Sequence, residues 1–130
     1  MAQIPAELLA DKRFAVGNDL VFLPDFKLSC TDLFKNKVYT GNEVDYCESF
    51  NSDAILHYAS TWAAKEAAYK ALKQVDKSSI GWKKIEILRD KIGGKPSVVV
   101  HQNGHQFQIS LSISHDGDYA WAIAFIEIKP

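Results

Sequence analysis

The fold is decided by the stretch Trp62-Ala63-Ala64-Lys65-Glu66-Ala67-Ala68-Tyr69-Lys70-Ala71-Leu72, which is rich in alanine and contains neither glycine nor proline. This composition predicts a helix. At about 100° per residue, Glu66 falls on the same side of that helix as its apolar stripe. The stripe consists of Ile55, Ala59, Trp62 and Tyr69. A carboxylate therefore lies on the face that the helix is expected to bury, where a charge is costly unless it is paired or binds a metal.

The role of Glu66 stays open when the helix is considered alone. Lys70 follows Glu66 by one helical turn, so the two side chains can form an ion pair at the edge of the core, worth roughly 0.3 kcal/mol. Lys65 lies on the flank of the same stripe. The alternative is that Glu66 binds a metal, and the rest of the chain has to decide between the two.

The size and charge of the chain predict one domain spanning residues 1–130. Of the 130 residues, 47% are hydrophobic and 24% are charged, and the net charge is −1. These values are ordinary for soluble globular proteins and predict no bulk attraction to nucleic acid or to a membrane surface. A local basic cluster is still possible, because several lysines lie close together in the sequence between residues 65 and 84.

The cysteines and the N-terminus favour a cytoplasmic protein. Cys30 and Cys47 have no spacing typical of a metal or redox site, which favours a reducing compartment. The N-terminus lacks the charged and apolar regions of a signal peptide, and no apolar run approaches the ~20 residues of a membrane span.

The N-terminal half contains a second acidic residue in an apolar setting. Residues 14–23 predict a strand, in which Asp19 shares a face with Ala15, Gly17 and Val21. Because these neighbours are small or apolar, two readings of Asp19 are open. It is either a solvated acid at a sheet edge or a metal ligand at the end of a strand.

Shorter helices are expected around this strand. A proline at the first turn predicts a helix at residues 5–12, and weaker patterns predict helical segments at 25–37 and 43–50. The cluster Asn51-Ser52-Asp53 is typical of a helix N-cap, so the central helix is expected at residues 54–73.

The C-terminal half predicts an antiparallel meander of strands at residues 82–88, 96–102, 106–114 and 119–128. Asn103-Gly104 and Asp116-Gly117 are two-residue hairpin signals. With Asp116-Gly117 as the loop, Ser114 pairs with Tyr119. One face then carries Ile109, Leu111, Ile113, Ala120, Ala122 and Ala124, and the other carries Ser110, Ser112, Ser114, Tyr119, Trp121, Ile123 and Phe125. The alanines would let the central helix lie close on the sheet. The predicted fold class is therefore α+β, with the N-terminal strand and the long central helix packed on an antiparallel sheet.

Three residues stand out as candidates for a functional site, namely Asp19, Glu66 and His115. Two carboxylates with lysines nearby suit Mg²⁺ bound to a phosphorylated ligand, because Mg²⁺ prefers one or two carboxylates together with phosphate oxygens and water. Lysines act on phosphate as point charges. His101 and His105 flank the first hairpin turn, where exposed histidines are favoured over a zinc site because no further ligands are in sight. His115 alone is equally well a hydrogen-bonded turn histidine.

Four motifs in order resemble those of the 4′-phosphopantetheinyl transferases, over residues 14–127. Gly17-Asn18-Asp19-Leu20-Val21 resembles their Gly-x-Asp-Ile motif, and the stretch 62–72 resembles Phe-Ala-x-Lys-Glu-Ala-x-x-Lys-Ala. Gly94-Lys95-Pro96 resembles their Gly-Lys-Pro turn. Ser112-Ile113-Ser114-His115 with Tyr119-Ala120 resembles the Ser-Ile-Ser-His…Tyr-Ala-x-Ala ending of the holo-acyl-carrier-protein synthase group.

The resemblance implies a Mg²⁺-dependent transfer of 4′-phosphopantetheine from coenzyme A to a serine hydroxyl of an apo acyl carrier protein, of fatty-acid, polyketide or peptide synthesis. Adenosine 3′,5′-bisphosphate is released. Asp19 and Glu66 are implied to hold Mg²⁺ against the pyrophosphate, and Glu66 is the candidate base for the serine. Lys70 and Lys65 are implied to neutralise phosphate oxygens. The adenosine end is assigned to Gly94, Lys95, Pro96, Ser114 and His115, with His115 near the 3′-phosphate.

The sequence also departs from the family pattern. The family's phosphate-binding arginine before the Phe of the helix motif is Thr61 here, and Lys73-Gln74-Val75-Asp76 replaces a Gly-Thr-Gly loop. Lys73 or Lys77 is a candidate replacement for the lost charge. Phe22 stands where the group usually has a glutamate. A short hairpin replaces a helix before the last motif, so the group's homotrimer, with sites between subunits, stands beside a monomer as the expected assembly.

Two other functions remain beside the transferase. Thr61 and the absent Gly-Thr-Gly favour a non-catalytic relative that binds a carrier protein or a coenzyme A-like ligand. The other alternative is a structural domain with an incidental pair of Glu66 and Lys70. The joint presence of Asp19, Glu66, Lys70 and His115 favours the enzyme, because a binding protein has no need of metal carboxylates.

Overall fold

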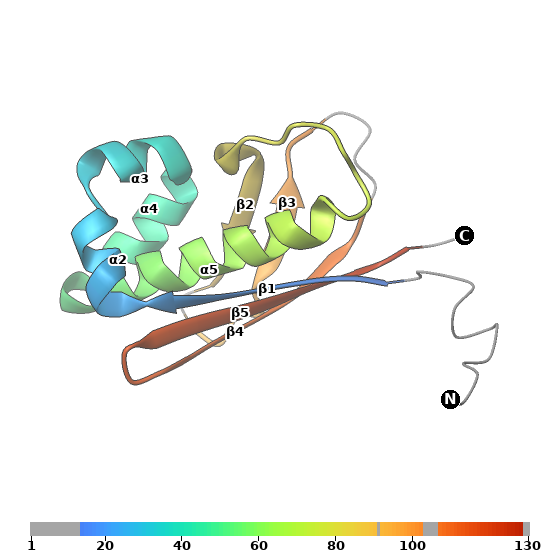
Figure 1. The fold of residues 1–130 in the computed structure, drawn as a ribbon. Helices are drawn as coiled ribbons and strands as arrows, with labels where there is room; N and C mark the ends of the chain where they lie inside the picture. The colour runs from blue at the N-terminus through green and yellow to red at the C-terminus, as the bar shows by residue number, and fades with distance from the viewer. Residues whose placement is uncertain (1–13, 91, 103–106, 129–130) are drawn as a thin grey trace.

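The protein is an α+β structure in which one long helix lies across a sheet (Figure 1). The computed structural model describes residues 14–90, 92–102 and 107–128. Within these ranges, β1 (Phe14–Phe22) leads into the helices α2 (Leu23–Ser29), α3 (Asp32–Val38), α4 (Gly41–Glu48) and α5 (Ala54–Leu72). The strands β2 (Ile85–Leu88), β3 (Ser97–Val100), β4 (Ile109–Asp116) and β5 (Tyr119–Glu127) follow. This order confirms the predicted fold class.

The predicted central helix is α5, which begins at Ala54 as expected and ends one residue early, at Leu72. Its N-terminus differs from the expected cap, because Asn51–Asp53 form a 3₁₀ turn and the Asp53 side chain accepts no capping hydrogen bond. The helical segments expected at 25–37 and 43–50 are confirmed, and the former is divided into α2 and α3. None of the helices in the described part of the chain combines the length and apolar character that crossing a membrane requires.

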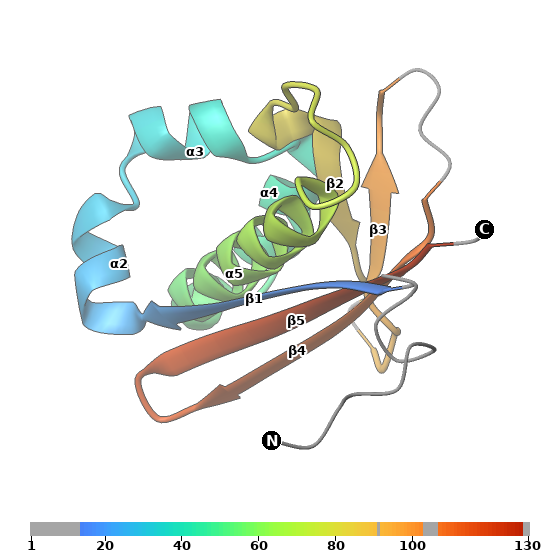
Figure 2. The ribbon, with the colours of Figure 1, turned by 45° about the vertical axis from the view of Figure 1, so that its right-hand side comes forward.

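The strands form two sheets rather than the single meander expected from the sequence. One antiparallel sheet has the order β1-β5-β4, and β2 pairs with β3 in a second sheet (Figure 2). Strand patterns indicate that a strand exists, but its partner depends on tertiary packing. The predicted helix at 5–12, the turn at Asn103-Gly104 and His105 lie outside the described residues.

The β4–β5 hairpin has the predicted faces but a different turn. Gly117 and Asp118 form its two-residue loop, and Ser114 pairs with Trp121 rather than with Tyr119. Gly117 has a φ of +55°, a conformation that glycine adopts without a steric penalty. The register differs from the prediction by an even number of residues, so every side chain keeps its predicted face.

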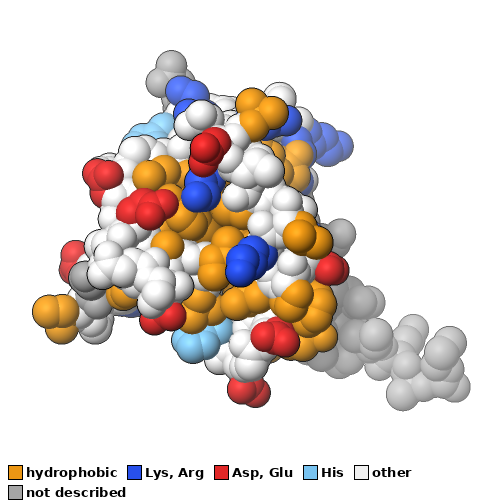
Figure 3. Space-filling view, turned by 90° about the vertical axis from the view of Figure 1, so that its left-hand side faces the viewer, with side chains coloured by type: hydrophobic (Ala, Val, Ile, Leu, Met, Phe, Trp, Pro, Cys, Tyr) orange, Lys and Arg blue, Asp and Glu red, His pale blue; other side chains and the backbone are white. Residues whose placement is uncertain are grey.

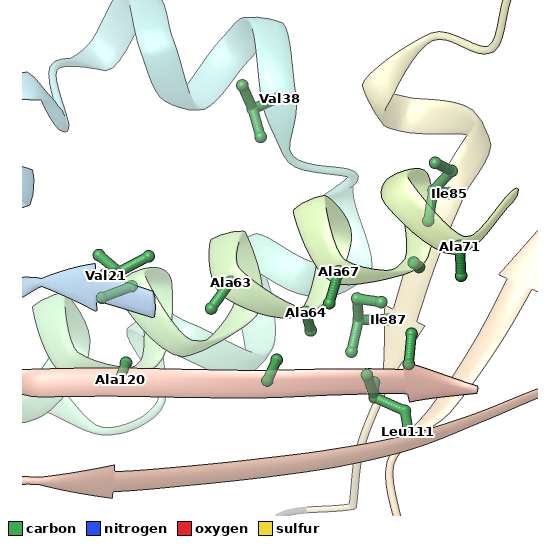
Figure 4. Close-up of a cluster of buried hydrophobic side chains, with 14 of the residues drawn as sticks. Val21, Val38, Ala63, Ala64, Ala67, Ala71, Ile85, Ile87, Leu111 and Ala120 are labelled. Atoms are coloured by element: carbon green, nitrogen blue, oxygen red, sulfur yellow. The ribbon is translucent and has the colours of Figure 1, made fainter. Parts of the chain in front are cut away.

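Small side chains on α5 and β5 bring the helix close to the sheet, as the row of alanines predicts (Figure 4). Alanine loses no rotamer freedom on burial, which makes such an interface inexpensive in entropy. The buried alanines of the interface are Ala63, Ala64, Ala67, Ala68 and Ala71 on α5, and Ala120, Ala122 and Ala124 on β5. Leu111 of β4 and Ile87 of β2 are also buried and extend this core (Figure 4).

The backbones of β1 and α5 lie in direct contact where the two elements cross at Gly17. A Cβ atom on Gly17 would lie 2.0 Å from the carbonyl oxygen of Ala67 and 2.7 Å from the amide nitrogen of Ala71. Only glycine leaves room for this approach. The contact fixes the separation of strand and helix beside two acidic residues, because Asp19 follows Gly17 on the strand and Glu66 precedes Ala67 on the helix.

The sheet face that points away from α5 is apolar. Burial alternates along β1 and β5, and the residues opposite the helix are exposed. Among them are Phe14, Val16, Leu20, Phe22, Tyr119, Trp121 and Phe125. We call these residues the outer apolar face. A contiguous exposed apolar surface marks an interaction site in a protein that is otherwise well packed.

Candidate functional site

The first candidate site is a hollow between β1, α2 and α5 that contains both predicted metal ligands. It has a volume of about 390 Å³, and Asp19 and Glu66 both line it. Its other lining residues are Leu20, Val21, Phe22, Asp25, Phe26, Ser29, Phe34 and Trp62. We call it the acidic hollow. At the end of the molecule that carries α2, α3 and the β4–β5 turn, hydrophobic side chains gather in the middle with acidic side chains around them (Figure 3).

Asp19 and Glu66 meet because strand and helix geometry turn them toward one another. Ala15, Gly17 and Val21 are buried toward α5, and Asp19 shares their side of β1, as the alternation predicts. The side chain of Asp19 is only 11% exposed, so it is not a solvated acid at a sheet edge. Glu66 is half-buried on the helix that packs against this strand.

The two carboxyl groups are electrostatically coupled. Burial, followed by the neighbouring Asp19 carboxyl, raises the pKa of Glu66 to about 7, while Lys70 acts in the opposite direction. Two carboxylates at such close range repel one another when both are charged. At neutral pH the pair therefore either retains a proton or requires a cation beside it.

Lys70 supplies one cation from the next turn of α5. Its Nζ lies 2.9 Å from Asp19 Oδ1 and 3.0 Å from the Asn18 carbonyl oxygen. Lys70 thus bridges helix and strand instead of forming the ion pair within the helix that was the alternative reading of Glu66. Its side chain is 51% exposed, so the ion pair with Asp19 is weak and is readily exchanged for a ligand anion.

The donor set of the acidic hollow fits a hard cation that brings further ligands with it. Residues 14–90, 92–102 and 107–128 contain no group of three or more His, Cys, Asp or Glu side chains that could hold a metal ion. Asp19 and Glu66 offer two carboxylates, and a cation between them would offset both the burial of Glu66 and its repulsion by Asp19, the two effects that raise the pKa of Glu66. Mg²⁺ binds in this way, with phosphate oxygens and water as its remaining ligands.

Lys65, which is expected from the sequence to neutralise phosphate, is buried inside the protein and does not line the acidic hollow. Its side chain is 0% exposed, and Nζ donates to the two carboxylate oxygens of Glu43 at 2.7 and 3.0 Å. Nζ also donates to the carbonyl oxygen of Ile85 at 2.5 Å. Burial lowers the pKa of Lys65, and Glu43 counteracts that effect. All donors of the ammonium group have acceptors, so the buried charge is fully paired.

The ion pair of Lys65 and Glu43 anchors α5 to α4 and β2. Glu43 also accepts hydrogen bonds from the backbone amides of Ile87 and Thr40, each at 2.8 Å, and the second belongs to the capping box of α4. Because Lys65 directly precedes Glu66, this anchor restrains rotation of the helix about its axis. Lys65 thus connects the turn of α5 that carries Glu66 to α4 and β2.

The second candidate site is a hollow of about 310 Å³ between α5, β4 and the β2–β3 connection. It brings together Gly94, Pro96 and His115, which the sequence assigned to one site. Its other lining residues are His57, Ser60, Arg89, Leu111, Ser112 and Ile113. We call it the histidine hollow.

Two residues predicted for the same site lie outside the histidine hollow. Lys95 is exposed and lines a neighbouring depression together with Arg89 and Asp90. Ser114 precedes His115 on β4, so its side chain points to the opposite side of the sheet, where Trp121 is its partner. The structure thus separates Lys95 and Ser114 from the three predicted residues that it brings together.

Arg89 and His57 belong to the histidine hollow without any signal in the sequence motifs. Arg89 directly follows β2, and its Nη2 donates to the Thr61 hydroxyl and to the His57 carbonyl oxygen. Burial, followed by the charge of Arg89, lowers the pKa of His57. A single arginine after a strand is unremarkable in a sequence, and only its contact across the fold with α5 reveals it.

Two other residues considered in the sequence analysis, His101 and Lys73, have hydrogen-bond partners within the fold. His101 directly follows β3, and its Nε2 lies 3.0 Å from Oε1 of Glu86 on β2. Lys73 Nζ donates to the carbonyl oxygens of Lys77 and Ser78 at 3.1 and 2.9 Å. The charge of Lys73 is therefore engaged in closing the loop after α5.

The two hollows lie at opposite edges of the three-stranded sheet. The acidic hollow is lined from β1 and the histidine hollow from β4, and β5 lies between these strands. One copy of the chain therefore presents its two sets of predicted site residues separately.

Known proteins are similar to this chain in sequence and in fold. The family model of the 4′-phosphopantetheinyl transferase superfamily matches residues 15–124. The holo-[acyl-carrier-protein] synthase of Aquifex aeolicus is 35% identical over 103 residues, which cover 75% of this chain and 83% of that protein. The enzyme of the same name from Ruminiclostridium cellulolyticum is 38% identical over 123 residues, covering 87% of this chain and 91% of that protein.

A solved structure is similar over nearly the whole chain. The ACPS–CoA complex of Chronobacterium ammoniagenes has a TM-score of 0.74 and 28% sequence identity, and the match covers 90% of this chain and 98% of that one. The range matched by the family model contains Asp19, Glu66, Lys70 and His115. The chain therefore belongs to the 4′-phosphopantetheinyl transferase superfamily and is similar to its holo-[acyl-carrier-protein] synthases.

Proposed function

We propose that the protein transfers 4′-phosphopantetheine from coenzyme A to a serine hydroxyl of an apo acyl carrier protein, with release of adenosine 3′,5′-bisphosphate. Membership of the superfamily and the likeness to a synthase–coenzyme A complex support this function. The observation that carries it is the pairing of Asp19 and Glu66 in one hollow. A protein that only binds its ligand has no need of two crowded carboxylates, whereas phosphoryl transfer requires a cation at that place.

Asp19 and Glu66 are the residues that would hold Mg²⁺ beside the pyrophosphate of coenzyme A. When bound, the metal neutralises the negative charge on the phosphate oxygens and polarises the phosphorus toward attack. The exposed ammonium of Lys70, next to Asp19, adds a point charge for the phosphate that leaves.

Proton transfer is assigned to Glu66. Its carboxylate accepts the proton of the carrier serine, directly or through a water molecule. The serine oxygen forms a bond to the β-phosphorus, and the bond from that phosphorus to the bridging oxygen breaks. The electron pair leaves with adenosine 3′,5′-bisphosphate, so no oxidant or further reactant is needed.

The adenosine end of coenzyme A is assigned to the histidine hollow, where Gly94, Pro96 and His115 lie together. Gly94 has a steric reason to be glycine, because a Cβ atom there would lie 2.5 Å from Asp90 Cβ. Lys95 borders the site from the neighbouring depression and adds positive charge there.

We further propose that each complete site forms between two copies of the chain, in a homotrimer. The two hollows of one copy lie at opposite edges of its sheet, so the acidic hollow of one copy would complete the histidine hollow of the next. The outer apolar face supports this assembly, because a second copy would remove its aromatic and aliphatic side chains from water.

Intact mass spectrometry tests the proposed transfer. The protein is incubated with coenzyme A, Mg²⁺ and a panel of apo carrier proteins of fatty-acid, polyketide and peptide synthesis. We expect a phosphopantetheinyl adduct on at least one carrier, and none when EDTA replaces Mg²⁺. If a folded sample modifies no carrier, the proposal is wrong. A rise in melting temperature with coenzyme A but without an adduct would instead identify the non-catalytic relative.

A further inference from the structure

We propose that Arg89 binds a phosphate monoester in the histidine hollow, and that this group is the 3′-phosphate of coenzyme A. The inference rests on the proposed function, because it names the recognition element for the same ligand. Arg89 belongs to none of the four sequence motifs. It is identified by its fixed guanidinium, by the lack of an acidic partner among the described residues, and by the hydrogen-bond donors around it.

Contacts with two helices hold the guanidinium of Arg89 in place. Nη2 donates to the Thr61 hydroxyl and, at 3.5 Å, to the His57 carbonyl oxygen, both on α5. The guanidinium also lies over the ring of Tyr46 on α4, with Cζ 4.3 Å from the ring centroid. An arginine restrained in this way loses little further entropy when it binds a phosphate with two parallel hydrogen bonds.

No carboxylate neutralises Arg89 within the described residues. The ion pairs found there join other side chains. Arg89 Nε is buried and has no hydrogen-bond partner. Burial lowers the pKa of Arg89, which reflects the cost of holding this charge away from water. A bound anion would supply the missing counter-charge.

The surroundings of Arg89 favour a phosphate over a neutral ligand. The polar side chains that line the histidine hollow with it are His57, Ser60 and His115, and the lining contains no acidic residue. Hydroxyl groups and imidazole rings donate hydrogen bonds to phosphate oxygens. A volume of about 310 Å³ leaves room for a phosphate and part of the sugar that carries it.

Thr61 connects Arg89 to α5. Thr61 is 1% exposed, and its hydroxyl donates to the His57 carbonyl oxygen at 2.7 Å. The same hydroxyl accepts the hydrogen bond from Arg89. Arg89 thus brings a positive charge from the end of β2 to the surface of α5.

The test compares coenzyme A with 3′-dephospho-coenzyme A, which differ only in the group that Arg89 is proposed to bind. kcat/KM is measured for both with the wild type, Arg89→Gln, Arg89→Lys and Lys84→Gln. Lys84 is exposed and lines no part of the histidine hollow, so its variant removes one positive charge elsewhere. Charge-assisted hydrogen bonds to a phosphate predict that the wild type prefers coenzyme A by about tenfold to a hundredfold.

We expect Lys84→Gln to keep this preference and Arg89→Gln to abolish it. A preference that survives in Arg89→Gln, or an equal loss with both substrates, overturns the proposal, because Arg89 would then be structural. If Arg89→Gln does not fold, Arg89→Lys decides. Lysine keeps the charge but loses the bidentate fork, so the preference should fall by at least about threefold. An unchanged preference in that variant also overturns the proposal.

Calorimetry without a carrier protein separates this proposal from the proposed function. The wild type should bind adenosine 3′,5′-bisphosphate more tightly than adenosine 5′-monophosphate, and Arg89→Gln should bind the two alike. If the wild type binds adenosine 3′,5′-bisphosphate more tightly than adenosine 5′-monophosphate but transfers nothing to a carrier, only the proposed function is contradicted. Transfer without an Arg89-dependent preference would contradict the Arg89 proposal alone.

Discussion

Replacement of Gly17 by alanine should disable the site without touching any reactive group. The new methyl would lie 2.0 Å from the carbonyl oxygen of Ala67, whereas ordinary van der Waals contact begins at 3.4 Å. Both clashing groups are backbone of packed elements, so strand and helix must separate by about 1 Å or more. Overpacking of this kind costs about 1–3 kcal/mol, which corresponds to a loss of roughly 5 °C or more in melting temperature.

The effect on activity should exceed the effect on stability. Asp19 and Glu66 are the nearest acidic neighbours of the contact along the strand and along the helix, so the same displacement changes their separation. A misplacement of about 1 Å in a catalytic constellation costs on the order of a hundredfold in rate. Transfer to a carrier protein is measured as kcat/KM at several Mg²⁺ concentrations, together with thermal melts. We expect a rate loss of that order and a higher Mg²⁺ requirement in Gly17→Ala.

Gly41→Ala is the matched control, because a Cβ atom there would have nothing within 4 Å. It should leave both melting temperature and transfer rate unchanged. If Gly17→Ala also behaves like the wild type in both measurements, the close approach of β1 and α5 does not set the geometry of the acidic hollow.

Three further predictions follow from buried and exposed groups. Lys65→Met leaves Glu43 buried without its cation and should lower the unfolding free energy in urea by about 3–5 kcal/mol, whereas the double variant Glu43→Gln, Lys65→Met should recover part of the loss. Wild-type stability of the single variant would refute this role of Lys65. In EDTA, stability should fall as the pH rises from 4.5 to about 7, because Glu66 binds its proton more tightly in the folded than in the unfolded state. The contribution of Glu66 is measured as the difference in melting temperature between the wild type and Glu66→Gln at each pH. A difference that grows in favour of the wild type as the pH rises would contradict the prediction. Leu20→Lys on the outer apolar face should dissociate the oligomer in sedimentation experiments, while Leu33→Lys on the exposed side of α3 should not. A monomeric wild type would disprove the shared site.

Local periodicity accounts for what the sequence predicts correctly. The alanine-rich run sets the bounds of α5 to within one residue, and strand alternation places Asp19 on the buried side of β1. The predicted faces also survive the shift of the hairpin loop from Asp116-Gly117 to Gly117-Asp118, because a change of register by an even number of residues preserves every face. These features depend on neighbours in the chain, which the sequence displays directly.

Features that depend on distant partners are the ones that sequence reasoning misses. A helical wheel places Lys65 near the edge of the apolar stripe, but it does not show that Glu43 and Ile85 cover that edge. It also gives no reason to connect Arg89 with Thr61. The pairing of β1 with β5, and the separation of β2 and β3 into a second sheet, are likewise set by packing across the fold.

The central claim is that Asp19 and Glu66 together hold the cation on which phosphopantetheine transfer depends. The most direct measurement is adduct formation on an accepting carrier, followed by intact mass while Mg²⁺ is titrated. The wild type, Asp19→Asn and Glu66→Gln are compared, with circular dichroism as the check of folding. We predict saturable Mg²⁺ dependence in the wild type and a loss of at least about a hundredfold in each folded variant, because each retains only one carboxylate. Wild-type rates in either variant, or undiminished transfer in EDTA, would contradict the claim.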